Sequence, residues 1–403
     1  MTVMTQKFRL VVTTTVAAGC AVVGVGALAA PSGGRPAIAT AQPAATGDAL
    51  AQSIARTQQQ VRRVPGDWPA WATLGLNYVE QARRTVDPTY YPKAAAALRR
   101  SLQIHPRGNF LAMAGEAALA SAQHRFYDAL RWARRGVRID PHSAVLRGAL
   151  ADALTQLGRY DAAARAARRM ELLRPGSDAE ARLSYAAELR GDIPRAEMLM
   201  RQARARAVGP DDVAFADYYL TELARTSGRP RAAFRFAQHG LMVLPSSAML
   251  LEGRARAEVA LGDTDAARRD FAAAIARVPQ PSYVLEYGDL LQSLGMHAAA
   301  RKQYALFRIE QRLFRANGVT LDSDATLFEA DHGSSAKAVR LGRAAIRTRP
   351  FLDSYDAYGW ALHRAGRDRA ALVAANKALS TGVHNPLFTH HRDVIRKALG
   401  SAR

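Results

Sequence analysis

The chain has 403 residues, a formal net charge of +21 and only 7% aromatic residues, so its interior must be filled largely by alanine and leucine. This composition favours closely packed helices, and no alternating Val, Ile and Thr pattern typical of strands occurs after residue 48. A single cysteine, Cys20, excludes disulfides as a source of stability. We therefore expect an all-α fold, and the large positive charge predicts an anionic neighbour such as membrane headgroups, wall phosphates or nucleic acid.

Residues 1–30 have the features of an export signal. Basic residues precede an uncharged apolar run over residues 10–30, with small residues 27–29 at cleavage spacing. The run is also long enough to span a bilayer as a helix, and residues 17–20 resemble a bacterial lipobox that would be lipidated at Cys20. Cleavage, anchoring and lipidation therefore all stay open, and each predicts an extracytoplasmic protein that is secreted or tethered to the cell membrane.

The next segment, residues 31–47, is rich in Pro, Gly, Ala and Thr. Such a composition cannot bury a core of its own. We expect a flexible linker between the leader and the rest of the chain.

Most of the remaining sequence repeats one unit. Seven glycines each precede an alanine by five residues, and successive alanines lie 33 to 38 residues apart. The glycine suits a turn between two helices, where a positive φ or close packing is needed, and the small alanine lets the second helix approach the first. A proline often follows and ends the second helix. The unit is helix, turn, helix and break, and its repetition predicts an α-solenoid. The pairs are Gly158/Ala163, Gly191/Ala196, Gly228/Ala233, Gly262/Ala267, Gly295/Ala300, Gly333/Ala338 and Gly366/Ala371.

The first unit carries a recognisable motif. Trp71, Leu74, Gly75 and Tyr78 match the opening W-x2-L-G-x2-Y of the tetratricopeptide repeat. Ala94, Leu98, Ser101 and Pro106 match its second half. The chain thus resembles the tetratricopeptide repeat (TPR) family, and it also looks like uncharacterised bacterial exported members of that family, a similarity that implies no activity.

This resemblance implies a right-handed α-solenoid of about nine helical hairpins over residues 68–383. Residues 48–67 are expected to form an N-terminal capping helix, and residues 384–403 a C-terminal capping helix and tail. The least regular part is a stretched helix over 298–317 followed by the unit around residues 326–333.

In the family, first helices line a concave groove and second helices form the convex side. Placing this sequence in that frame gives an acidic, partly aromatic groove that would grip a protein or peptide partner carrying Lys or Arg. The residues expected to contact the partner are Asp152, Asp178, Tyr185, Glu188, Phe215, Tyr218, Glu222, Arg225, Glu252, Arg256, Asp289, Asp356, Trp360 and His363.

Arginines concentrate on the second helices, as in Arg165, Arg168, Arg340, Arg343 and Arg347. Spacings of three and four keep many of them on one side of each helix. The resulting basic ridge either faces an anionic membrane or cell-wall polymer or simply keeps an alanine-rich protein soluble.

The sequence lacks the common motifs of catalytic sites. The sequence has no P-loop, H-E-x-x-H or G-x-S-x-G. Ser334 and Lys337 fit S-x-x-K in letters, but Ser334 is better interpreted as the polar start of a second helix. His384, His390 and His391 are interpreted as surface residues and not as metal ligands. We therefore predict no enzymatic activity, no cofactor and no metal.

The function predicted from the sequence is a protein–protein interaction scaffold or adaptor outside the cytoplasm. The basic charge leaves a nucleic-acid-binding helical-repeat protein as one alternative, although an acidic groove and an export signal argue against nucleic acid as a partner. A non-catalytic subunit of an envelope enzyme complex is the other alternative.

Overall fold

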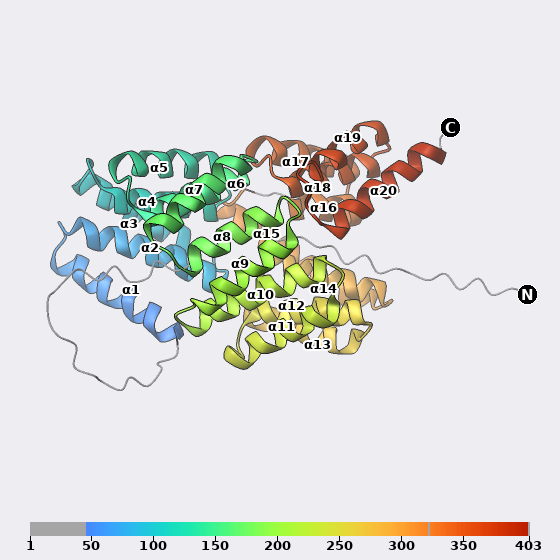
Figure 1. Cartoon of the computed structure of the whole chain (residues 1–403), viewed down its shortest axis with the longest axis horizontal. Helices are drawn as coiled ribbons and strands as arrows, with labels where there is room; N and C mark the ends of the chain where they lie inside the picture. The colour runs from blue at the N-terminus through green and yellow to red at the C-terminus, as the bar shows by residue number, and fades with distance from the viewer. Residues whose placement is uncertain (1–45, 321–322, 402–403) are drawn as a thin grey trace, which may run out of the picture.

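The computed structural model describes residues 46–320 and 323–401, so the predicted leader and nearly all of the predicted linker lie outside the described residues. Within these ranges the chain forms twenty helices and no strand. Nine helical hairpins follow one another between a single helix at each end (Figure 1). The prediction of an all-α repeat solenoid is confirmed. No helix in the described ranges combines the length and the apolar character needed to cross a bilayer.

Each hairpin consists of a first and a second helix. The single helices at the ends are α1 (Thr46–Arg63) and α20 (Pro386–Ser401). The first helices are α2 (Trp68–Thr85), α4 (Phe110–Ala122), α6 (Ala144–Gln156), α8 (Ser177–Glu188), α10 (Pro210–Thr226), α12 (Ala248–Leu261), α14 (Pro281–Ser293), α16 (Ser323–His332) and α18 (Leu352–Arg364). The second helices are α3 (Tyr90–Ile104), α5 (Phe126–Ile139), α7 (Tyr160–Leu173), α9 (Ile193–Ala205), α11 (Pro230–Val243), α13 (Thr264–Arg277), α15 (His297–Ala316), α17 (Ser335–Thr348) and α19 (Asp368–Ala378).

The repeated glycines and alanines act as the sequence predicts. Six of the seven turn glycines adopt a φ between 67° and 89°, a backbone conformation that costs glycine little. The seventh, Gly333, instead lies so close to Glu329 that any Cβ would overlap its carboxylate. All seven alanines are buried. In the first hairpin, a Cβ on Gly75 would lie 2.5 Å from Leu98 Cγ, so this glycine lets α2 and α3 approach each other closely.

The packing order places the first helices on the inside of the curvature. First helices of neighbouring hairpins contact each other. Examples are the pairs α2 and α4, α6 and α8, α10 and α12, and α16 and α18. Each second helix packs on its own first helix, and most also pack on the next helix in the chain. The long helix α15 meets α16 through the rings of Phe307 and Phe328, which are 4.8 Å apart. We call the surface formed by the first helices the inner face and that formed by the second helices the outer face.

Successive turns of the superhelix touch. Gln123 Nε2 donates to Asn317 O at 2.9 Å, and Gln123 O accepts from Thr320 N at 3.0 Å. These bonds join the turn of the second hairpin to the segment after the seventh. Arg349 Nε donates to Gln156 Oε1 at 2.7 Å in a buried position, which joins the third hairpin to the segment after the eighth.

Two turn glycines lie at the same interface. A Cβ on Gly158 would come within 2.6 Å of Pro350 O, and a Cβ on Gly191 would overlap Gly382 O. The turns of the second, third and fourth hairpins therefore meet the segments after the seventh, eighth and ninth. This constant offset of five hairpins explains why α16–α20 lie beside α6 and α7 although α8–α15 separate them in sequence (Figure 1).

The irregular region of the sequence builds part of this closure. Helix α15 has twenty residues, and Phe314 near its end packs, with Val319 beyond it, against the apolar cluster of the first two hairpins. The extra length thus carries the chain across to α2 and α4. The sequence showed that this unit is unusual but not that it docks on another part of the array.

Candidate functional site

A buried chain of charged residues crosses the middle of the inner face. Arg256 of α12 donates to Glu222 Oε2 on α10 at 2.9 Å and to Glu286 Oε2 on α14 at 2.7 Å. Its side chain also contacts Glu252 one helical turn away, and Arg225 donates to Glu222 Oε2 at 2.8 Å. The Arg256 side chain is 1% exposed. These bonds join three successive hairpins through one guanidinium group.

Burial and charge act in opposite directions on these carboxyl groups. Burial alone would raise the pKa of Glu222, but the guanidinium groups of Arg225 and Arg256 lower it to about 2. Burial raises the pKa of Glu252 well above its ordinary value despite the nearby Arg256. Burial and the charge of Glu222 raise the pKa of Glu188 to about 7. The cluster therefore carries less negative charge than its count of glutamates indicates.

Burial reduces the number of predicted groove residues that a partner could contact. The side chains that the structure places inside helix–helix contacts are those of Tyr218, Glu188, Glu222, Glu252, Arg256 and Asp356, all between 0% and 9% exposed. The reason is the packing of adjacent helices, since Arg256 lies between Glu222 and Glu286 of the neighbouring first helices and His391 of α20 contacts Asp356. A partner cannot reach these side chains in this arrangement, and their predicted contact with a partner would require the array to open.

The other predicted groove residues are partly exposed and fall into two places. One group lies on α6, α8 and α10, and the other on α14 and α18. They are Asp152, Asp178, Tyr185, Phe215 and Arg225 in the first group and Asp289, Trp360 and His363 in the second.

In the first group, an arginine that was not among the predicted groove residues binds the carboxylate of Asp152 and the backbone carbonyl of Asp178. Arg182 of α8 donates to both oxygens of Asp152 on α6, at 2.9 Å and 2.7 Å, and to Asp178 O at 2.9 Å. Burial raises the pKa of Asp152 and of Asp178 even though Arg182 opposes it. The separation of 30 residues between Asp152 and Arg182 is close to one repeat, which is the signal that could have revealed the pair.

Partly exposed aromatic rings lie on α8 and α10, the second and third helices of this group. The rings of Phe215 and Tyr219 on α10 are 4.7 Å apart, and Tyr219 meets the buried Tyr218 edge-on at 5.4 Å. Burial, with the charge of Glu188 second, raises the pKa of Tyr185 on α8 well above its ordinary value. Tyr219 follows directly after a residue assigned to the groove, so the sequence frame missed it by one position.

The turn of the first hairpin reaches this region from the other side. Arg84 Nη2 lies 3.3 Å from Asp211 Oδ2 at the start of α10, and Arg84 Nε pairs with Glu80 at 2.7 Å. Five hairpins of the array thus bend enough to bring α2 and α10 into contact. The partly exposed aromatic rings and carboxylates of α8 and α10 therefore lie in the curve between the first and fifth hairpins.

In the second group, aspartates and histidines join the last first helices. His332 Nε2 of α16 lies 2.8 Å from Asp289 Oδ1 of α14. Trp360 Nε1 of α18 donates to Asp331 Oδ1 of α16 at 2.8 Å, and burial raises the pKa of Asp331. His363 pairs instead with Asp368 of its own hairpin. These contacts fix neighbouring hairpins to each other.

The same pattern attaches the last helix. His391 Nδ1 of α20 lies 2.9 Å from Asp356 Oδ2, and its ring stacks on Trp360 at 4.2 Å. His391 is buried, in contrast to the surface position predicted for it, whereas His384 and His390 are exposed. No group of three or more His, Cys, Asp or Glu in the described ranges is arranged to hold a metal ion.

No family model matches the chain, and no curated protein matches it in sequence. Solved structures do match it. The human IFIT1 dimer with m7Gppp-AAAA aligns with a TM-score of 0.51 and 14% identity over 82% of this chain and 76% of that chain. The chain has a tetratricopeptide-like solenoid fold.

Two further solved structures match with lower TM-scores. Cut9 in the APC/C Cut9–Hcn1 hetero-tetramer has a TM-score of 0.47 and 12% identity, and the match covers 87% of this chain and 60% of that chain. The type IV pilus biogenesis factor PilW has a TM-score of 0.42 and 19% identity over 55% of this chain and 97% of that chain. This chain thus spans less than two thirds of the length of Cut9.

Proposed function

We propose that the chain is a non-enzymatic scaffold that acts outside the cytoplasm and holds a protein or peptide partner on its inner face. The observation that carries this proposal is that Tyr185, Phe215 and Tyr219 are partly exposed on α8 and α10, the two helices that also carry the partly exposed Asp178 and Asp211. Aromatic rings next to carboxylates suit a segment with Lys or Arg, because they combine apolar burial, cation–π contact and charge pairing.

The proposed location rests on the sequence of residues 1–30, which has the features of an export signal. In that location the exposed arginines of the outer face would lie against an anionic membrane or wall polymer. Protease treatment of spheroplasts that express a C-terminally tagged chain tests the location. Digestion of the array is expected, and a protected array in intact spheroplasts would contradict an extracytoplasmic scaffold.

Capture of partners tests the inner face. The double variant Phe215→Ala/Tyr219→Ala removes the accessible rings, and Tyr127→Ala removes an aromatic side chain that is 44% exposed on the outer helix α5. We expect the double variant to recover the main crosslinked envelope partner at least about fivefold less than wild type, since aromatic anchors dominate such interfaces. Tyr127→Ala should recover it normally. Equal recovery by both folded variants would rule out this part of the inner face.

A second candidate is RNA binding, favoured by the net charge of +21. One neighbour in fold, human IFIT1, was solved with m7Gppp-AAAA. Electrostatic binding to RNA would weaken steeply as salt rises. Fluorescence anisotropy with a labelled single-stranded RNA from 50 to 300 mM salt, roughly the range over which that term acts, tests this candidate. An affinity that falls steeply with salt would support RNA binding, and no binding at the lowest salt would rule it out.

A further inference from the structure

A cleft on the outer face gathers arginines without carboxylates. It has a volume of about 660 Å³ and lies between α17 and the turn of the ninth hairpin. Arg340, Arg343 and Arg347 of α17 and Arg367 of the turn line it, with Val339 at its apolar side. All four arginines are exposed. The repeat pattern alone placed three of them on a basic ridge, but only the structure shows that they share a partly enclosed space with Arg367.

The carboxylates nearest in sequence are engaged elsewhere. Glu329 pairs with Lys337 at 2.7 Å and Asp368 with His363. Asp353, after the end of α17, pairs with Arg349 at 3.0 Å. Over the described part of the chain, no ion pair within 4.0 Å joins a cleft arginine to Asp or Glu.

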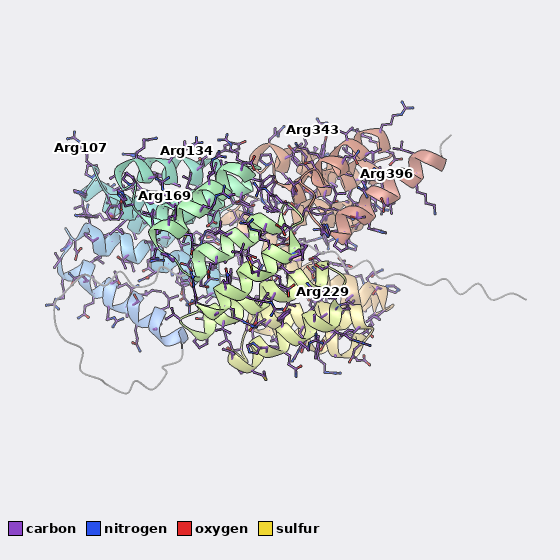
Figure 2. All side chains as sticks on the ribbon, in the orientation of Figure 1. Arg107, Arg134, Arg169, Arg229, Arg343 and Arg396 are labelled. Carbon is purple, nitrogen blue, oxygen red and sulfur yellow. The ribbon has the colours of Figure 1, made fainter. Side chains whose placement is uncertain are left out.

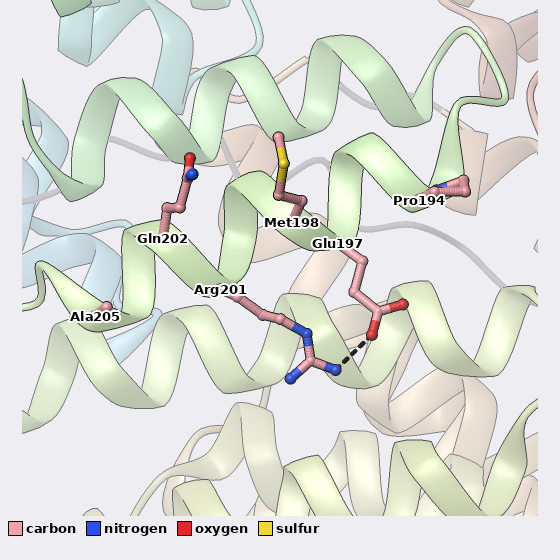
Figure 3. A pocket seen from close by; sticks show the side chains of 6 residues that line it. All are labelled: Pro194, Glu197, Met198, Arg201, Gln202 and Ala205. Atoms are coloured by element: carbon pink, nitrogen blue, oxygen red, sulfur yellow. Dashed lines mark hydrogen bonds and ion pairs between the residues drawn. The ribbon is translucent and has the colours of Figure 1, made fainter.

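A second cleft of the outer face differs in its charge. The cleft on α9 has a volume of about 460 Å³ and contains Arg201, which donates to Glu197 at 2.6 Å (Figure 3). Glu197 also accepts from Arg229 at 2.7 Å. The one arginine of that cleft thus has a carboxylate partner within the cleft, whereas the α17 cleft concentrates four positive charges. Arg343 is among the arginines at the outer surface in Figure 2.

We propose that the cleft between α17 and the α18–α19 turn binds a ligand with two or more adjacent phosphate groups. Guanidinium groups present paired N–H donors that match the oxygens of phosphate. Arg340 and Arg347 are seven residues apart, which is about 10 Å along a helix. One phosphate cannot contact the whole row, but a chain of two or three phosphates can. The volume also falls in the range of small-ligand sites, roughly 300 to 1,000 Å³. This site lies on the outer face and does not depend on the proposed inner-face partner.

Isothermal titration of the full-length chain in non-ionic detergent with sodium tripolyphosphate, at constant ionic strength, tests the site. The test variant is Arg340→Gln/Arg343→Gln. Its matched control is Arg165→Gln/Arg168→Gln on α7, because those exposed arginines stand two and five residues after Ala163, as Arg340 and Arg343 stand after Ala338. We expect one tripolyphosphate per chain, a Kd at least about tenfold weaker for the test variant and a change under about twofold for the control.

The source of the phosphates is distinguished by a second arm. Vesicles of phosphatidylcholine with cardiolipin, a lipid with two phosphates, are sedimented with the same variants. Loss of sedimentation in Arg340→Gln/Arg343→Gln alone assigns the site to a lipid headgroup, while a loss confined to tripolyphosphate assigns it to a soluble ligand. The proposal is overturned if wild type binds no tripolyphosphate, or if both folded variants lose binding equally, which would indicate unspecific attraction to the net charge.

Discussion

At the residue scale, two buried acidic groups have pKa values shifted in opposite directions. Glu222 has two guanidinium partners and a pKa lowered to about 2 against the effect of burial. Glu310 on α15 is 6% exposed, and neither of its carboxylate oxygens has a hydrogen-bond partner. Burial raises the pKa of Glu310 to about 8. Arg256 therefore lets a charge persist inside the array, whereas Glu310 is held in its neutral form at neutral pH.

Glu310 should make stability depend on pH. Its folded pKa lies above the unfolded value of 4.5, so the folded chain retains a proton that the unfolded chain has lost between about pH 4.5 and 8. Stability must fall as pH rises through that window. At pH 8.5, the free energy of unfolding of Glu310→Gln should therefore exceed that of wild type by about 2 kcal/mol or more. Near pH 4.5 the two should differ little.

Urea unfolding followed by circular dichroism at both pH values measures this effect. Glu197→Gln is the control, because Glu197 accepts from Arg201 and Arg229 and its pKa is lowered by them despite burial. That variant should not be more stable than wild type at pH 8.5. A Glu310→Gln variant that shows the same pH profile as wild type would contradict the assigned burial.

At the element scale, the sequence predicted those features that are local to one hairpin. Ser334 begins α17 and its Oγ accepts from Lys337 N at 3.4 Å, as its capping assignment requires. The turn glycines and their alanine partners stand where the repeat places them. Contacts such as that of Arg182 with Asp152 were not predicted, because they join different hairpins. A single sequence shows which residues are polar but not which hairpin supplies the partner.

Attachment of the last helix gives a prediction at this scale. Asp356 is 1% exposed, its Oδ1 has no hydrogen-bond partner, and its Oδ2 faces His391 of α20. His391→Leu would leave that carboxylate buried and unpaired, which typically costs about 1 to 3 kcal/mol and more for a charged group. Amides of residues 386–401 should then exchange with deuterium at least about tenfold faster. His390→Leu, at the exposed neighbouring position, is the control and should leave exchange unchanged. Equal protection in both variants would mean that apolar packing alone holds α20.

At the scale of the whole molecule, the array departs from a simple solenoid. Repeats of a solenoid normally contact only their neighbours, so stability is close to a sum over adjacent units. Here the turns of the second, third and fourth hairpins meet segments five hairpins further along. Leu189 and Phe351 even share one apolar cluster with Leu387 of α20. The repeat spacing could not predict this closure, because it depends on the small rotation between hairpins summed over five units.

The closure can be tested with two matched glycines. Gly191 and Gly228 both have a positive φ, 75° and 71°, so alanine strains the two turns alike. A Cβ on Gly191 would also overlap Gly382 O, whereas nothing lies within 4 Å of a Cβ on Gly228. Gly191→Ala should therefore destabilise the chain by about 1 to 3 kcal/mol more than Gly228→Ala, the usual cost of overpacking. It should also increase the radius of gyration in small-angle scattering, because the turn can relieve the overlap only by moving away from α20. Identical losses and identical radii for the two variants would show that the turns of the superhelix do not depend on this contact in solution.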